Sequence, residues 1–196
     1  MTKRIDNIMK IILGSQSFWR KKVLESMGYD FEVMIPRIDE KAIRDEDPKQ
    51  LVLKIGRAKA EALLPKIKED AILITSDQVG VCDGEIREKP ENEAEVRKFL
   101  QSYEKYPVQT VTSVITTNTK TGKTAEGIDI AKLWFSKFSD DQIEKIAKDK
   151  VVYTFAGGYN MAYADIADHV IKIEGTIDSV QGLPIELTKK LIKQVS

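Results

Sequence analysis

The sequence predicts a mixed α/β fold, in which a twisted sheet of parallel and antiparallel strands is flanked by helices and a cleft separates two lobes. In the first half, short apolar runs at residues 9–13, 31–34 and 71–76 alternate with amphipathic helical segments. The second half contains two longer segments, the first rich in Val and Thr, that flank a turn at Thr121-Gly122, which is typical of an antiparallel hairpin. The element order begins as α/β and becomes α+β, so a mixed sheet is expected rather than a purely parallel one.

Each element of the first half has a local signal. Residues 9–13 read as a short buried strand, and residues 14–17 supply a turn and an N-cap before a helix over 18–27. A second strand is expected at 31–34, and Asp47-Pro48 is typical of a helix start. The helix that follows places its apolar residues on one face: Leu51, Ile55, Ala58 and Ala62.

The middle and last elements follow in order. Residues 71–76 are apolar and β-branched enough for a central strand. Residues 79–82 either continue this strand or form the first arm of a hairpin at Asp83-Gly84. The remaining expectations are a helix at 91–103, hairpin strands at 108–117 and 128–138, a helix from a Ser139/Gln142 capping box to 148, short strands at 151–155 and 170–173, and a last helix from Pro184 to 192.

Composition narrows the class of protein. The 196 residues contain no Pro/Gly/Ser-rich linker, so one domain over 1–196 is expected. The 31 basic and 31 acidic residues cancel, which argues against nucleic acid or an anionic membrane as a partner. The single cysteine, Cys82, is consistent with a reducing compartment such as the cytoplasm, and no secretory segment follows Met1. Because the chain has only one histidine, His169, neither a His-based zinc site nor a Ser-His-Asp triad is expected.

A first group of residues is suited to phosphate. Ser15, Gln16 and Ser17 precede a basic first helical turn containing Arg20, Lys21 and Lys22. Backbone amides and the positive end of a helix dipole favour an anion, and Arg can add two parallel hydrogen bonds. The alternative is an ordinary capped helix with solvated basic side chains, and this segment alone favours that alternative.

A second group is suited to a metal ion and its chemistry. Asp39-Glu40 follows the strand at 31–34, and Asp77 ends the apolar run at 71–76. Carboxylates at strand ends commonly form α/β active sites, and their oxygens suit Mg²⁺ or Mn²⁺. Lys59 and Lys89 offer point charges for phosphate oxygens. Taken singly, Asp39-Glu40 reads equally as a surface turn and either lysine as a solubilising surface residue.

The ordered set of motifs resembles the Maf proteins, nucleoside triphosphate pyrophosphatases with a fold related to the inosine triphosphatase type. The resemblance covers nearly the whole chain and rests on these stretches: ILGSQSFWRKKVLESMGYDFEV, RIDE at 37–40, LVLKIGRAKAEAL from Leu51, SDQV at 76–79, DGEIREKP ending at Pro90, AGGY from Ala156, and EGTIDSVQGLP from Glu174. Each stretch is a weak signal, whereas their common order is a strong one.

The resemblance implies roles for individual residues. Ser15, Arg20 and Lys21 would hold phosphates, and Lys59 and Lys89 would contact the polyphosphate. Asp77 would be the catalytic proton acceptor and would share a divalent cation, Mg²⁺, Mn²⁺ or Co²⁺, with Glu40. The resemblance also implies a homodimer. A nucleotide-binding regulator with little turnover remains the alternative from a different class.

The same resemblance bears on the base. Relatives that act on 7-methyl-GTP carry Trp and Gln where dTTP/UTP enzymes carry Arg and Thr, and this chain has Trp19 and Gln78. An indole can stack on a methylated, cationic purine, although Trp19 also reads as a packing residue of the first helix. The segment 160–168 lacks the family's Glu-Gly or Gln-Gly element. Either Asp165 takes its place after a shift of register, or the position falls on Ala162. Phe18 and Glu88 replace a family proline and glycine.

Overall fold

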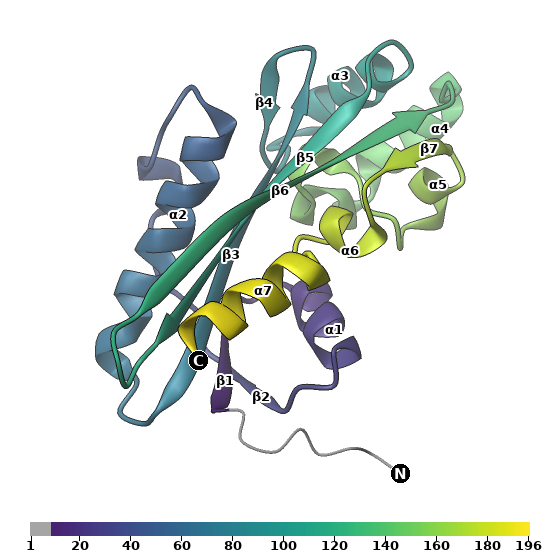
Figure 1. Cartoon of the computed structure of the whole chain (residues 1–196). Helices are drawn as coiled ribbons and strands as arrows, with labels where there is room; N and C mark the ends of the chain where they lie inside the picture. The colour runs from purple at the N-terminus through teal and green to yellow at the C-terminus, as the bar shows by residue number, and fades with distance from the viewer. Residues whose placement is uncertain (1–8) are drawn as a thin grey trace.

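A computed structural model describes residues 9–196, which form a seven-stranded mixed sheet flanked by helices (Figure 1). The strands are β1 (Lys10–Gly14), β2 (Phe31–Val33), β3 (Ala71–Cys82), β4 (Glu85–Arg87), β5 (Val108–Asn118), β6 (Thr124–Phe135) and β7 (Val170–Glu174). Their spatial order is β2-β1-β3-β5-β6-β7, with β4 paired to β3. Strand β1 is parallel to β2 and β3, whereas the other pairings are antiparallel. The expected mixed sheet is therefore confirmed.

Helices cover both faces of this sheet (Figure 1). They are α1 (Phe18–Ser26), α2 (Pro48–Leu63), α3 (Glu93–Tyr103), α4 (Asp140–Lys148), α5 (Ala164–Ala167), α6 (Ile177–Val180) and α7 (Ile185–Val195). Helix α2 packs against β3 and β5 on one face, while α1 and α7 share an apolar core with β1 on the other. Helices α3 and α4 enclose an aromatic core at one end of the sheet. No helix within residues 9–196 is both long and apolar enough to cross a membrane.

Strand β3 organises the molecule because two strands share one of its edges. Strand β1 pairs with its first half, as far as Thr75, and β4 pairs with its last three residues, beginning at Gly80. Strand β5 pairs along the opposite edge over almost the whole length of β3. Residues 76–79 therefore have no strand beside them on the first edge, and the cleft described below opens there.

The alternation of side chains along β3 sends neighbouring residues to opposite faces of the sheet. Thr75 points toward α2, where its hydroxyl donates to the Gly56 carbonyl at 2.8 Å. Ser76 points to the other face and donates to the Gly182 carbonyl at 2.9 Å. Asp77 consequently lies on the α2 face, and Gln78 lies on the face that carries α6.

Most of the expected elements are confirmed, including the Ser139/Gln142 capping box. The second hairpin strand begins earlier than expected, at Thr124, because its polar first residues pair in register with the end of β5. The expected strand at 151–155 is wrong: Lys150–Thr154 is a 3-10 helix. The Asp149 carboxylate caps it by accepting from the Val151 amide at 3.0 Å. This local hydrogen bond gives the backbone an alternative to a strand ladder.

Candidate active site

A cleft with a volume of about 1040 Å³ opens along the free edge of β3. Its walls come from the β1–α1 loop, from α2, from the segment after β4 and from residues 153–160 and 180–181. Most of the site residues expected from the sequence line this cleft: Ser15, Trp19, Arg20, Glu40, Lys59, Asp77, Gln78 and Lys89. Residues that are far apart in the chain therefore meet at the carboxyl end of the parallel strands, where α/β sheets place their ligands.

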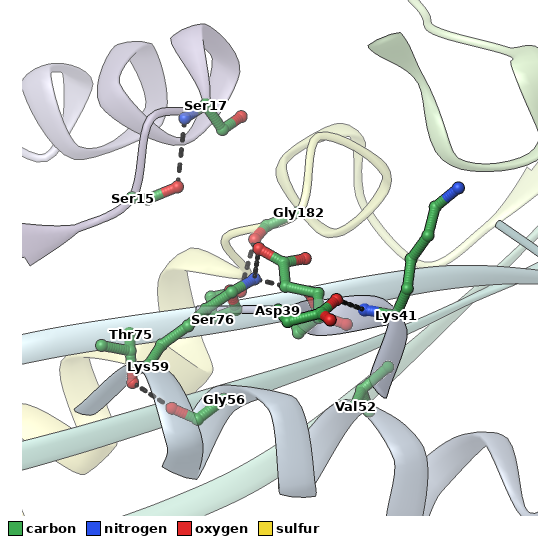
Figure 2. A network of polar contacts seen from close by, with 12 residues as sticks. Ser15, Ser17, Asp39, Lys41, Val52, Gly56, Lys59, Thr75, Ser76 and Gly182 are labelled. Carbon is green, nitrogen blue, oxygen red and sulfur yellow. Dashed lines mark hydrogen bonds and ion pairs between the residues drawn. The ribbon is translucent and has the colours of Figure 1, made fainter. Parts of the chain in front are cut away.

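Lys59 connects the two carboxylates expected to hold a metal. Its Nζ lies 2.7 Å from Asp77 Oδ1 and 3.3 Å from Glu40 Oε1. The lysine reaches this position from α2, and its ammonium also lies 3.4 Å from the Ser76 carbonyl (Figure 2). The Lys59 side chain is only 6% exposed, whereas that of Glu40 is 45% exposed. A buried cation thus holds one buried and one accessible carboxylate at the base of the cleft.

Burial and nearby cations have opposite effects on the pKa of Asp77. Burial raises the pKa of the Asp77 carboxyl above its ordinary value, and the nearby charges of Lys59 and Arg20 oppose that rise. A raised pKa makes a carboxylate a better proton acceptor while the cations keep it available in ionised form. This combination of burial and specific partners is typical of functional carboxylates.

Arg20 holds the cleft together as well as adding positive charge. Its Nε donates to the Gly182 carbonyl at 2.9 Å, and its Nη1 donates to the Ser76 carbonyl at 3.0 Å. Burial lowers the pKa of Arg20, and the charges of Asp77 and Glu40 act against this. Gly182 has a φ of 88°, and a side chain there would approach Arg20 Nε to 3.3 Å. The guanidinium therefore joins the loop before α7 to the exposed edge of β3.

The loop before α1 offers groups suited to phosphate. Ser15 is buried, and its Oγ accepts from the Ser17 amide at 3.1 Å, so the hydroxyl proton remains able to donate. Ser17 caps α1 by accepting from the Arg20 amide. Among residues 9–196 the amides of Phe18 and Trp19 have no hydrogen-bond partner, as expected for a first helical turn. Lys89 is exposed at the opposite wall and forms no ion pair within the described chain.

Gln78 has fewer free hydrogen-bonding groups for a ligand than the amino-acid type alone suggests. Its Nε2 donates to Thr112 Oγ1 at 2.7 Å and to the Ser179 carbonyl at 3.0 Å. Both N–H groups of the carboxamide are therefore used within the protein, and only the oxygen can face a ligand. Trp19, by contrast, is partly exposed in the cleft and packs edge-on against Phe18, with ring centroids 5.0 Å apart.

Two expected site residues lie elsewhere. Lys21 is exposed on α1 and does not line the cleft, because the helical turn directs it away from neighbouring Arg20. Asp165 lies on α5, where its carboxylate accepts from Lys145 Nζ at 2.8 Å, and it also lies outside the cleft. Lys145 lowers the pKa of Asp165 by the same contact. Neither residue therefore lines the cleft in the described part of the chain.

Two other cleft residues have no counterpart in the sequence-based prediction. Arg87 is 3% exposed and stacks on Phe99 at 4.5 Å, and its Nε and Nη1 have no partner among residues 9–196. Asn160 is 8% exposed and also lines the cleft. Alternation along β4 gives no signal for Arg87, because its neighbour Ile86 lines the same cleft. Asn160 lies in an irregular loop, where no helical or strand periodicity indicates the direction of a side chain.

The residues at the base of the cleft fit a hard divalent cation. Within residues 9–196 no group of three or more His, Cys, Asp or Glu side chains has metal-binding geometry. Mg²⁺ is usually held by one or two carboxylates, with water and substrate phosphates completing its coordination. Glu40 and Asp77 supply such a pair, since both already share one cation, Lys59. A metal bound there would neutralise phosphate charge.

The fold and the cleft together define an α/β protein in which a buried lysine lies between two carboxylates at the base of a cleft that also contains Ser15 and Arg20. Residues 10–195 match the family model described as Maf-like protein, and the chain belongs to this family. The family resemblance expected from the sequence is therefore confirmed.

Individual relatives share most of their length with this chain. A 7-methyl-GTP pyrophosphatase from Dictyostelium discoideum is 52% identical, over 95% of this chain and 97% of its own. A dTTP/UTP pyrophosphatase from Vibrio vulnificus is 31% identical, over 94% of this chain and 98% of its own. A nucleoside-triphosphatase, or dITP/XTP pyrophosphatase, from Mycobacterium abscessus superposes with a TM-score of 0.42 at 11% identity, over 66% of this chain and 76% of its own.

Proposed function

We propose that this protein hydrolyses a nucleoside triphosphate to the monophosphate and pyrophosphate. The observation that carries the proposal is the buried Lys59, which joins Asp77 to Glu40 at the base of a cleft lined by Ser15 and Arg20. Phosphoanhydride hydrolysis requires a proton acceptor for water, cations for the departing pyrophosphate, and a site that neutralises the phosphates. The family membership and the names of the two curated relatives support the same reaction.

Each residue has a role in this proposal. Asp77 takes a proton from the attacking water, whose oxygen bonds to phosphorus as the pyrophosphate leaves. Lys59, Arg20 and Lys89 place positive charge around the phosphates, and the Ser15 hydroxyl donates to a phosphate oxygen. Glu40 and Asp77 would hold a divalent cation, which would neutralise phosphate charge. The direct test measures release of pyrophosphate from a panel of canonical and modified nucleotides. If none of them releases pyrophosphate, the alternative of a nucleotide-binding regulator with little turnover is favoured.

Activity is expected to require an added divalent ion. Glu40 and Asp77 offer oxygen ligands, which prefer Mg²⁺ or Mn²⁺, and Co²⁺ is also accepted by such sites. Exhaustive dialysis against EDTA should remove at least nine tenths of the activity, and each ion in turn should restore it. Full activity after dialysis would contradict the carboxylate pair as a metal site.

We further propose that the base is a modified purine such as 7-methylguanine. Trp19 is accessible in the cleft and offers an aromatic face to a cationic ring. The Dictyostelium discoideum relative, which is named a 7-methyl-GTP pyrophosphatase, supports this choice, while the Vibrio vulnificus relative supports dTTP and UTP as the alternative. The fully engaged amide of Gln78 limits that residue to accepting a hydrogen bond.

Trp19→Ala is expected to lower kcat/KM for 7-methyl-GTP by about tenfold, because a stacking contact is worth about 0.5–2 kcal/mol. The value for UTP should change far less. Trp134→Ala is the matched control, because Trp134 lies on β6 under Lys172, outside the cleft. Preference of the unmodified protein for dTTP or UTP would show that Trp19 packs rather than binds the base, without affecting the proposed reaction.

The cellular setting and assembly are part of the same proposal. We expect a cytoplasmic protein, since its single cysteine, Cys82, is free and buried. A homodimer is also expected from the family resemblance. Sedimentation of the purified protein tests the assembly directly.

A further inference from the structure

Asn160 lies at the wall of the cleft, directly after a packed aromatic residue. The residue before it, Tyr159, is buried and packs against Tyr103 and Phe135, with ring centroids 5.8 Å and 5.9 Å away. Just upstream, Gly157 adopts a φ of 70° and its carbonyl accepts from the Tyr103 hydroxyl. The aromatic core and this hydrogen bond therefore place the Asn160 backbone, and the side chain is only 8% exposed.

The orientation of the Asn160 carboxamide follows from one contact. Its Oδ1 accepts from the Ala162 amide at 2.8 Å. Because a backbone N–H can only donate, the oxygen must face it and the nitrogen must face the other way. Within residues 9–196 that nitrogen, Nδ2, makes no hydrogen bond, and it is not among the fully buried atoms left without a partner, so it keeps surface that a ligand in the cleft can reach. Two N–H donors are thus left unused by a nine-tenths buried side chain in the wall of the cleft.

We propose that Asn160 determines base specificity by donating from Nδ2 to a carbonyl oxygen of the nucleotide base. This rests on the proposed nucleotide substrate. Such a donor favours keto bases, which present guanine O6 or uracil O4, over adenine and cytosine, which present an amino group at that position. The donors of Gln78 are already used by Thr112 and Ser179, so Gln78 does not duplicate this contact. Methylation at N7 of guanine removes one acceptor from that edge and leaves O6.

Asn160→Asp isolates the proposed contact. The carboxylate keeps an oxygen for the Ala162 amide, so the loop is retained, but it has no N–H to donate. The new negative charge should weaken the binding of all four nucleotides to a similar extent. This effect therefore cancels when the affinity for one nucleotide is divided by that for another. The control is Asn92→Asp, because Asn92 Oδ1 also accepts a backbone amide, that of Glu95 at 3.0 Å, but lies outside the cleft.

The experiment measures calorimetric binding of GMP, AMP, UMP and CMP together with kcat/KM for the four triphosphates. In Asn160→Asp the preference for GMP over AMP, and for UMP over CMP, should fall by about tenfold or more, since a site left without its donor no longer rejects the wrong base. Asn160→Ser, which is shorter but uncharged, should lose the same preference. Asn92→Asp should leave both preferences unchanged.

The outcomes separate this inference from the proposed reaction. Equal losses for keto and amino nucleotides, or a wild-type protein without keto preference, would overturn the role of Asn160 and leave pyrophosphate release intact. A wild-type protein that releases no pyrophosphate but prefers GMP in an Asn160-dependent way would support Asn160 and overturn the reaction. Absence of binding to all four monophosphates would overturn the base contact.

Discussion

Asp77→Asn is expected to lower pyrophosphate release by at least about 10³-fold, because a general base contributes on the order of 10²–10⁴ and Asp77 is also a proposed metal ligand. The amide keeps the shape of the carboxylate but cannot accept the proton. Lys59 can still donate to the remaining amide oxygen, so nucleotide affinity and the circular dichroism spectrum should change little. Stopped pyrophosphate assays and calorimetric titration with nucleotide provide the two readouts.

Asp165→Asn is the control for this experiment. Asp165 is an acidic residue that the sequence placed among the specificity residues but that the structure pairs with Lys145 outside the cleft. Its variant should retain wild-type kcat/KM and base preference. Retention of even a tenth of the activity by Asp77→Asn would show that another group takes the proton.

Lys59→Met should lower kcat/KM by about 100-fold or more and also reduce stability. The substitution keeps the apolar length of the side chain but leaves buried Asp77 without its closest cation, at 2.7 Å, and breaking a buried pair typically costs about 3–5 kcal/mol. Loss of the ammonium also lets the pKa of Asp77 rise further above its ordinary value, since burial is then less opposed. A base must be ionised to act, so the acidic limb of kcat should move to higher pH.

Lys54→Met provides the matched comparison. Lys54 lies on the same helix, but its Nζ pairs with Asp45 at 2.6 Å on the exposed side. Exposed pairs contribute little, so neither the pH profile nor the thermal midpoint should change appreciably. An acidic limb of Lys59→Met that coincides with the wild-type limb would show that Lys59 does not set the ionisation of Asp77.

Local patterns accounted for much of the fold. Strand β1 and the first half of β3 are short, mostly apolar runs, and Asp47-Pro48 begins α2 at the expected residue. The Ser139 capping box could also be predicted from the sequence, because it depends only on two residues three positions apart. The 3-10 helix at Lys150–Thr154 was not predicted, because its β-branched residues suit a strand, whereas the structure shows that the Asp149 carboxylate caps a helical turn there.

The candidate site divides in a similar way. Asp77 was recognisable because a carboxylate ending an apolar strand is costly unless it has partners, and the burial of this residue bears that out. Family motifs then brought Lys59 and Glu40 into the same prediction, and the structure places Lys59 Nζ 3.3 Å from Glu40 Oε1. Lys21 and Asp165 were also proposed from their positions in the chain, but exposure on α1 and pairing with Lys145 separate them from the cleft.

By itself, the sequence determined most of the strands and helices, the family and the chemical types of the proposed site residues, because these depend on neighbouring residues and ordered motifs. Only the tertiary structure decided which donors remain available to a ligand. Gln78 and Asn160 carry the same carboxamide group, yet contacts with Thr112 and Ser179 use the donors of Gln78, while the oxygen-side contact with Ala162 leaves those of Asn160 unused. Hydrogen bonding is directional, and one acceptor for the Gln78 amide lies 101 residues away in the chain, so the assignment depends on the fold rather than on composition or spacing.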